Sequence, residues 1–124
     1  MADEYDRKWR ETLFTCGYCW VFTTVLRDDY GLPARGALNA FGIPTHCWGV
    51  FNKDGVDYQG IRPEGEILKD CRCDAKPADL TEYDLTRMSM PPAKMAKALD
   101  YQLFDLAREI LNTENRFKSL RNDK

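Results

Sequence analysis

The sequence has no long hydrophobic run, no large excess of charge and only one histidine. Its longest apolar stretches, such as residues 19–24, are far shorter than the roughly 20 residues of a membrane-spanning helix. The net charge of −2 comes from interleaved acids and bases, so we expect no broad basic surface for nucleic acid. The first residues, MADEYDRKWRE, are polar and acidic, unlike a secretory signal peptide. We therefore expect a cytoplasmic protein with neither a membrane nor a nucleic-acid partner.

The five cysteines are an odd number, which fits a disulfide framework poorly. In the cytoplasm they should be thiols. The 124 residues are 44% hydrophobic and 31% charged, which is typical of a globular domain and not of a disordered chain. We expect a single domain over residues 1–124, and the sequence leaves its oligomeric state open.

Local sequence patterns predict several helices. The predicted helices are residues 3–13, residues 19–30, residues 63–71 and a long segment that follows Pro91-Pro92. Gly31 and Pro33 form a stop signal for the second of these helices. Beyond Asn112 the chain is polar and basic, and we expect it to fray.

From His46 onward, the hydrophobic pattern of the sequence repeats every two residues, as in a β-strand. HCWGVF and VDYQGI flank the segment NKDG, whose Asp-Gly pair is a strong turn signal, and this predicts a β-hairpin. Residues 34–40 are a further predicted strand, whereas residues 71–90 are polar and irregular. The order of elements predicts an α+β fold: a small antiparallel sheet packed against helices, with a nucleophile-bearing helix and a long C-terminal helix.

Two cysteine pairs, in CGYC and CRC, raise the possibility of a zinc site. The four ligands would be Cys16, Cys19, Cys71 and Cys73. CGYC resembles one half of a zinc knuckle, but CRC leaves one residue between ligands where two to four are usual. The apolar WVF that follows Cys19 is typical of a buried helix and not of an exposed knuckle. Spacing therefore makes zinc the third choice, and we expect no metal or other cofactor.

Cys19 is better placed to be a nucleophile. It follows Gly17 and begins a predicted helix, where the helix dipole and the free N–H groups favour the thiolate. The same N–H groups can stabilise the charge on an attacked carbonyl oxygen. A thiol nucleophile needs a base, and His46 is the one histidine available, at the start of a predicted strand.

The hairpin offers two candidates for the group that orients the imidazole. If the turn spans residues 52–55, Gln59 lies opposite Trp48. Gln59 then lies one pleat from His46 on the same face, and Asp57 lies one pleat further away. An aspartate is the commoner partner, but this register favours Gln59, whose carbonyl can also accept an imidazole N–H.

A family resemblance supports this hypothesis. CGYCWVF resembles the nucleophile region of papain-type proteases, where Cys-Gly-(Ser/Ala)-Cys-Trp carries the catalytic cysteine second. The order of Cys19, Gly31-Leu32-Pro33, His46, Asp54-Gly55 and VDYQGI is similar to that of small papain-like and transglutaminase-like proteins of bacteria and phages. The resemblance covers about residues 15–70. It implies a Cys-His-Asp/Asn/Gln triad on a helix and an antiparallel sheet, and some deamidase toxins of this superfamily use Gln.

The chain also departs from the papain pattern. The upstream glutamine that helps to build the papain oxyanion hole has no match in LFTCGY, residues 13–18. The second half of a papain fold is missing too, so the resemblance implies a short substrate groove. Trp20 and Trp48 are the candidate substrate-binding side chains.

We therefore expect a small cysteine hydrolase or acyltransferase that attacks a protein or peptide amide. Protease, deamidase and transglutaminase share this first step, so the triad does not separate them. The target would be cytosolic, and host-directed if the gene belongs to a phage or encodes an effector. The alternative is a non-catalytic binding or inhibitor protein on the same scaffold. An enzyme requires Cys19 to have a low pKa, to be partly exposed and to lie within hydrogen-bond reach of His46.

Overall fold

The protein forms one five-stranded antiparallel sheet with helices on both faces. The computed structural model describes residues 8, 10–11, 14, 18–71, 76–81, 85 and 93–122, without the side chains of residues 93–101 and 122. The strand order is β4-β3-β2-β1-β5. The strands are β1 (Ala34–Leu38), β2 (Pro44–Phe51), β3 (Asp54–Asp57), β4 (Gly60–Pro63) and β5 (Lys76–Asp79). The helices are α2 (Cys19–Tyr30), α3 (Glu64–Asp70), α5 (Ala93–Thr113), the 3₁₀ turn η1 (Asn115–Phe117) and α6 (Lys118–Asn122). The predicted α+β fold is confirmed.

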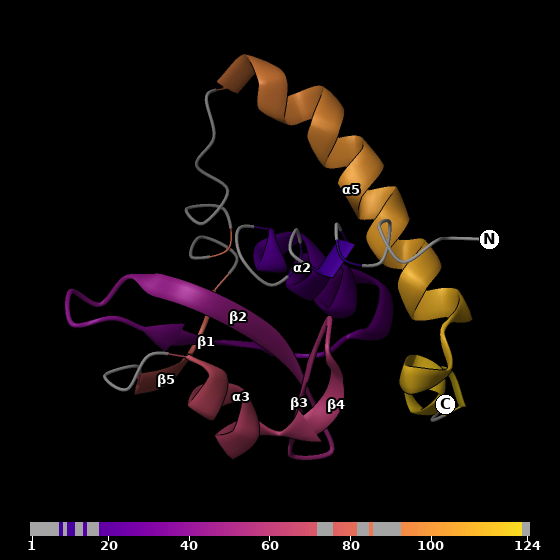
Figure 1. Cartoon of the computed structure of the whole chain (residues 1–124). Helices are drawn as coiled ribbons and strands as arrows, with labels where there is room; N and C mark the ends of the chain where they lie inside the picture. Colours follow the sequence, from indigo (N-terminus) through magenta and orange to yellow (C-terminus); the bar gives the residue numbers. More distant parts are fainter. Residues whose placement is uncertain are drawn as a thin grey trace.

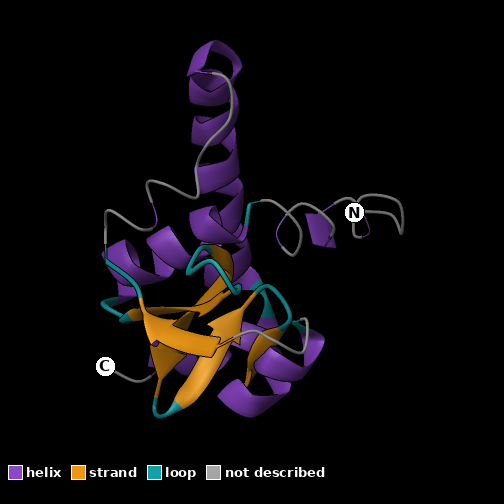
Figure 2. Cartoon of the chain, turned by 90° about the vertical axis from the view of Figure 1, so that its left-hand side faces the viewer, coloured by secondary structure: helices purple, strands orange, loops and turns teal. Residues whose placement is uncertain are grey.

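The sheet separates two hydrophobic cores. The larger core lies on the face covered by α2, here called the α2 face, and joins residues such as Phe22, Val56 and Leu103. The smaller core consists of Ala37, Trp48 and Ile67 on the opposite face, the α3 face. Figure 1 shows α2 above the sheet and α3 below it. Figure 2 shows the long helix α5, which packs against α2, extending beyond the sheet.

Helix α2 ends where the sequence signal predicts. Gly31 adopts the left-handed conformation, with φ of 70°, and its N–H bonds to the carbonyls of Arg27 and Leu26. The N–H of Leu32 also bonds to Leu26 O, at 3.2 Å, which closes the last turn. This stop turns the chain directly into β1 and fixes the position of α2 on the sheet.

The small residue Gly49 lets α2 pack closely on β2. A Cβ atom at this position would lie 3.2–3.3 Å from side-chain atoms of Leu26 and Leu32. Near the other end of the helix, Cys19 and Cys47 belong to the same core. The helix therefore runs along β2, with its first residue over the start of the strand.

Two predictions for the C-terminal half are wrong. Within the region predicted to be irregular, residues 76–79 form β5, which pairs with β1 at the edge of the sheet. The chain beyond Asn112 does not fray, because Phe117 and Leu120 are buried in the larger core. Arg121 secures this end by donating to the carbonyls of Leu111 and Glu114. Periodicity missed both segments because each is short and gains its stability from tertiary packing.

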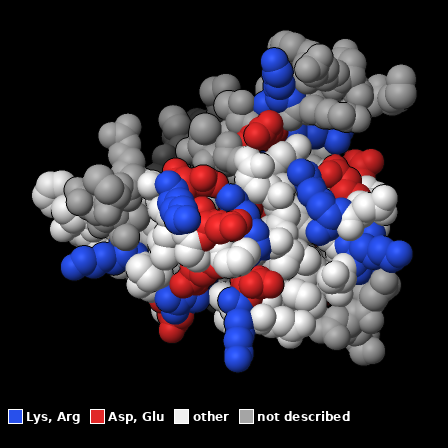
Figure 3. Space-filling view, turned by 60° about the horizontal axis from the view of Figure 1, so that its bottom comes forward, with Lys and Arg blue, Asp and Glu red and all other residues white. Residues whose placement is uncertain are grey.

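The predicted helix at residues 3–13 lies almost wholly outside the described residues. Within the described part of the chain, no helix combines the length and the apolar character needed to cross a membrane. On the face seen in Figure 3, acidic and basic side chains are interspersed and not separated by sign.

We expect Gly55→Ala to destabilise the protein by about 1–3 kcal/mol through overpacking. An added Cβ would collide with Ile67 Cδ1 and lie 3.1 Å from Trp48 Cδ1, so the fully buried Ile67 side chain would have to shift within the smaller core. Gly65→Ala is the matched control, because nothing lies within 4 Å of its Cβ position in α3. Helix propensity makes the control neutral or stabilising by up to about 1 kcal/mol. Urea unfolding of both variants measures the difference, and equal effects would contradict the tight packing of α3.

Candidate active site

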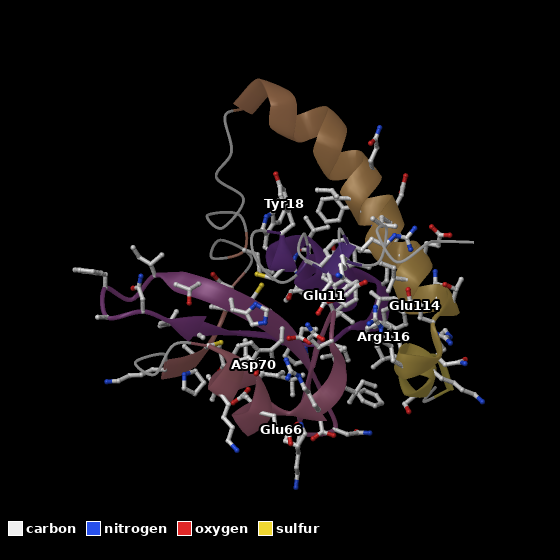
Figure 4. All side chains as sticks on the ribbon, in the orientation of Figure 1. Glu11, Tyr18, Glu66, Asp70, Glu114 and Arg116 are labelled. Carbon is white, nitrogen blue, oxygen red and sulfur yellow. The ribbon has the colours of Figure 1, made fainter. Side chains whose placement is uncertain are left out.

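The structure places Cys19 at the first residue of α2, as the sequence predicts. Tyr18 is the N-cap and makes no side-chain capping bond. Figure 4 shows Tyr18 at the start of α2, on the opposite side of the sheet from Asp70. The N–H groups in the first turn of a helix lack partners within the helix and carry its positive end, which favours a thiolate at this position.

His46 connects Cys19 to a buried carboxylate. Its Nε2 lies 3.1 Å from Asp57 Oδ2. Because Nε2 faces the carboxylate, Nδ1 is the ring nitrogen left for the hydrogen bond with the Cys19 thiol. The His46 side chain is 15% exposed and that of Asp57 is 4% exposed. The three side chains thus form a Cys-His-Asp series that begins at a helix N-terminus.

The surroundings of these groups favour a thiolate–imidazolium pair. Hydrogen bonding with Cys47, and then with His46, lowers the pKa of Cys19 well below that of an ordinary thiol, although burial opposes this change. Burial would lower the pKa of His46, but hydrogen bonds to Asp57 and Cys19 raise it to about 9. Complete burial raises the pKa of Cys47 well above its ordinary value, so Cys47 keeps its proton and donates it to the Cys19 sulfur.

Asp57 is held by three donors. Its Oδ2 accepts from His46 and, at 3.5 Å, from Arg62 Nη2. Its Oδ1 accepts the backbone N–H of Gln59 at 2.9 Å. Arg62 is held in turn by Asp70, at 2.6 Å from Nη1. A buried carboxylate with this set of partners can orient the imidazole and stabilise its positive charge.

The predicted preference for Gln59 needs correction. The turn between β2 and β3 contains only Asn52 and Lys53, both with positive φ, at 49° and 73°. It is therefore a two-residue turn, and the predicted register is wrong by two residues. Extending the observed pairing of Gly49 with Val56 puts Asp57 opposite Trp48.

Gln59 itself lies in the turn after β3, where its side chain is exposed. Its amide donates to Glu11 at 3.2 Å, and its backbone N–H supports Asp57. The structure thus brings Asp57, and not the Gln59 side chain, to His46.

The two tryptophans proposed for substrate binding lie in the cores. Trp48 has no exposed surface, and its Nε1 donates to Glu64 Oε2 at 3.0 Å on the α3 face. Trp20 is 7% exposed and packs edge-on against Phe104 of α5, with ring centroids 5.8 Å apart. Both indoles are therefore packing side chains, because neither offers a surface to a substrate.

The four-cysteine zinc site falls partly outside the described residues, since Cys16 and Cys73 are not among them. Within the described part, no group of three or more His, Cys, Asp or Glu side chains is arranged to hold a metal ion. Cys71, at the end of α3, directs its thiol to the carbonyl of Ile67 at 3.4 Å.

Sequence reasoning missed Cys47 and Arg62. Strand alternation assigned Cys47 to packing on the face opposite His46, yet its thiol contacts Cys19. The signal was the spacing of two small residues, Cys47 and Gly49, which line the strand beneath α2. Arg62 had no local signal, because its contact with Asp57 depends on the tight turn between β3 and β4.

Cys19 differs from the expectation in one respect, because only 4% of its surface is exposed. Cys19 lies with Cys47 in the larger core. The His46 side chain keeps more exposure, at 15%.

Stability should depend on the pH because His46 binds its proton more tightly when the protein is folded. Its pKa rises from 6.5 to about 9, so this contribution is fully present below 6.5 and is lost as the pH rises through 9. The shift corresponds to about 3 kcal/mol. The lowered pKa of Cys19 depends partly on His46 and changes stability in the opposite direction, so wild type should exceed His46→Gln in unfolding free energy most between about pH 6.5 and 9. The difference should shrink as the pH rises above about 9. Urea unfolding on both sides of this pH tests it, and a difference that stays constant above about 9 would contradict the raised pKa.

Comparison of the chain with protein families, with curated proteins and with solved structures finds no match. Cys19, His46 and Asp57 are therefore the residues from which a function can be inferred.

Proposed function

We propose that the protein is a small cysteine-nucleophile enzyme that transfers an acyl group from an amide, with Cys19 as nucleophile, His46 as acid and base, and Asp57 as the orienting carboxylate. One observation carries the proposal: the His46 ring joins the thiol at the start of α2 to a buried carboxylate. This is the arrangement that thiol-dependent acyl transfer requires. The resemblance to papain-like and transglutaminase-like proteins points to the same chemistry.

In the proposed reaction the Cys19 thiolate attacks the carbonyl carbon of the amide. The first-turn N–H groups of α2 are the nearest candidates to stabilise the oxyanion. The His46 imidazolium gives its proton to the leaving amine as the C–N bond breaks, and an acyl-thioester forms on Cys19. Neutral His46 then takes a proton from water or from an acceptor amine, which releases the acyl group. Asp57 stabilises the imidazolium throughout.

The final acceptor separates the candidate activities. If water accepts an acyl group that came from a peptide bond, the protein is a protease. If water accepts one that came from a glutamine side chain, it is a deamidase. If an amine accepts the acyl group, it is a transglutaminase. The proposed substrate is a cytosolic protein or peptide.

The first test uses p-nitrophenyl acetate, a small activated acyl donor that needs no knowledge of the natural substrate. We expect an acetyl group on Cys19, detected by mass spectrometry of intact protein and peptides, with a burst of nitrophenolate. Cys19→Ala should abolish both signals, and Cys71→Ala should retain them because Cys71 lies at the end of α3. Acetylation of Cys71 or lysines alone would contradict the proposal. The acetyl-enzyme can then be offered water or amines to identify the acceptor.

The burial of Cys19 specifically favours the second candidate, a binding or inhibitor protein on the same scaffold. A purely structural thiol would react with no acyl donor until the protein unfolds. An active one should react with small donors and discriminate strongly against bulky ones. A series of acyl esters of increasing size therefore separates the two candidates, because inertness to the smallest ester favours the binding role.

A further inference from the structure

In the described part of the chain, a second buried thiol, Cys47, neighbours Cys19. Cys19 and Cys47 are free, and both are buried in the larger core, where hydrogen bonding between the two thiols shifts the pKa of each. They come from different elements, α2 and β2, held together by the close packing at Gly49. The acyl-transfer reaction uses Cys47 only as a hydrogen-bond donor, so the contact calls for an explanation of its own.

We propose that Cys19 and Cys47 form a reversible redox pair, in which hydrogen peroxide oxidises Cys19 and Cys47 then closes a disulfide with it. The chemistry goes beyond the proposed acyl transfer and does not depend on it. A disulfide would remove the Cys19 nucleophile, so oxidation would also switch off any acyl transfer.

The two steps balance in atoms and electrons. In the first, the Cys19 thiolate attacks one oxygen of hydrogen peroxide, the O–O bond breaks, and the leaving hydroxide takes the His46 proton as water. Cys19 becomes a sulfenic acid. In the second, the Cys47 sulfur attacks the Cys19 sulfur, the S–S bond forms and the S–O bond breaks. The hydroxide that leaves takes the Cys47 proton as a second water. A small dithiol restores both thiols.

The surroundings fit both steps. With 4% of Cys19 exposed, a molecule as small as hydrogen peroxide can reach the sulfur more readily than a bulky disulfide can. Beside Cys47 lies the buried Thr23 hydroxyl, which makes no regular hydrogen bond within the described residues. That hydroxyl can stabilise negative charge on Cys47 as its proton leaves. Cys71 lacks this environment, because its thiol already donates to Ile67 O at the end of α3.

The test treats the reduced full-length protein with one equivalent of hydrogen peroxide and maps the products. Chymotrypsin cleaves after Tyr18 and so separates Cys16 from Cys19, while trypsin cleaves after Arg72 and separates Cys71 from Cys73. We expect one linked pair of peptides, containing Cys19 and Cys47, with the loss of two hydrogen atoms. Dithiothreitol should reverse it. A link from Cys19 to Cys16, or no link to Cys47, would overturn the proposal.

Two variants sharpen the result. In Cys47→Ala the sulfenic acid has no partner, and the loss of the Cys47 hydrogen bond also makes Cys19 less reactive. The readout is therefore the share of oxidised Cys19 that becomes sulfinic acid, which should be about tenfold higher than in wild type at excess peroxide. Cys71→Ser should form the 19–47 disulfide as wild type does. If Cys19 over-oxidises equally in wild type and Cys47→Ala, Cys47 does not resolve it and the pairing is overturned. Should Cys47→Ala fail to fold, the peptide map of wild type still decides the matter.

Discussion

Replacing His46 with alanine should slow the alkylation of Cys19 by iodoacetamide about ten- to a hundredfold at pH 6. Without the imidazolium, Cys19 loses a partner that lowers its pKa and remains in a buried site that raises it. An ordinary thiol with a pKa of about 8.5 is thiolate in roughly 0.3% of molecules at this pH, whereas the lowered pKa of Cys19 makes a larger fraction thiolate. The expected fall in rate is partly offset, because a more basic thiolate is a better nucleophile. This offset is the reason that the lower limit of the expected effect is only about tenfold.

The measurement is the rate of alkylation between about pH 5 and 9, followed at the Cys19 peptide. The background should carry serine at Cys16, Cys71 and Cys73 but keep Cys47, because the Cys47 hydrogen bond is the largest cause of the lowered pKa of Cys19. Gln59→Ala is the matched control. Its exposed side chain lies in a turn and bonds to Glu11, so the rate should stay within about twofold of wild type.

Both outcomes are informative. If His46→Ala shifts the reactivity profile of Cys19 to higher pH and Gln59→Ala does not, the ion pair exists and Asp57 remains the candidate third residue. If wild type and His46→Ala react alike, with the profile of an ordinary thiol, Cys19 has no catalytic base and the binding role becomes the better hypothesis.

Helix α2 could be predicted from the sequence because its signals are local. Cys19 opens the apolar run, and Gly31 supplies the left-handed residue that ends it. The hairpin was also predicted, but its register was not. Asp54-Gly55 looked like the turn, yet the glycine is required because α3 packs against it, and Asn52 and Lys53 make the turn instead. Gly55 is thus needed for packing against α3, although in the sequence Asp54-Gly55 looks like a turn.

The same limit explains the missed parts of the site. Alternation along β2 correctly places neighbouring side chains on opposite faces of the sheet. It does not show where the pairing of β2 with β3 ends. That pairing stops at Gly49, so His46 lies beyond it, beside Asp57 at the end of β3. Cys19 can therefore contact both His46 and Cys47. Positions of this kind depend on where elements end relative to each other, which periodicity does not report.

Asp57→Asn should lower the unfolding free energy by about 2–3 kcal/mol and bring the pKa of His46 down from about 9 toward its ordinary 6.5. The amide keeps the shape of the side chain but removes the charge that faces His46 and Arg62 in a buried site. Asp70→Asn is the matched control. It changes the same residue type on the same arginine, but that carboxylate is 63% exposed, so the cost should stay below about 1 kcal/mol.

The single histidine makes the second half of this prediction direct, because its NMR signal needs no assignment. We expect the His46 ring of wild type and Asp70→Asn to titrate near pH 9, and that of Asp57→Asn to titrate at clearly lower pH. A fall in stability without the change in titration would mean that Asp57 serves Arg62 and the fold. A lowered pKa joined to slower alkylation of Cys19 would show that the carboxylate acts through the imidazole on the thiol. Only the second result makes Asp57 part of the site, since a buried ion pair alone is weak evidence of function.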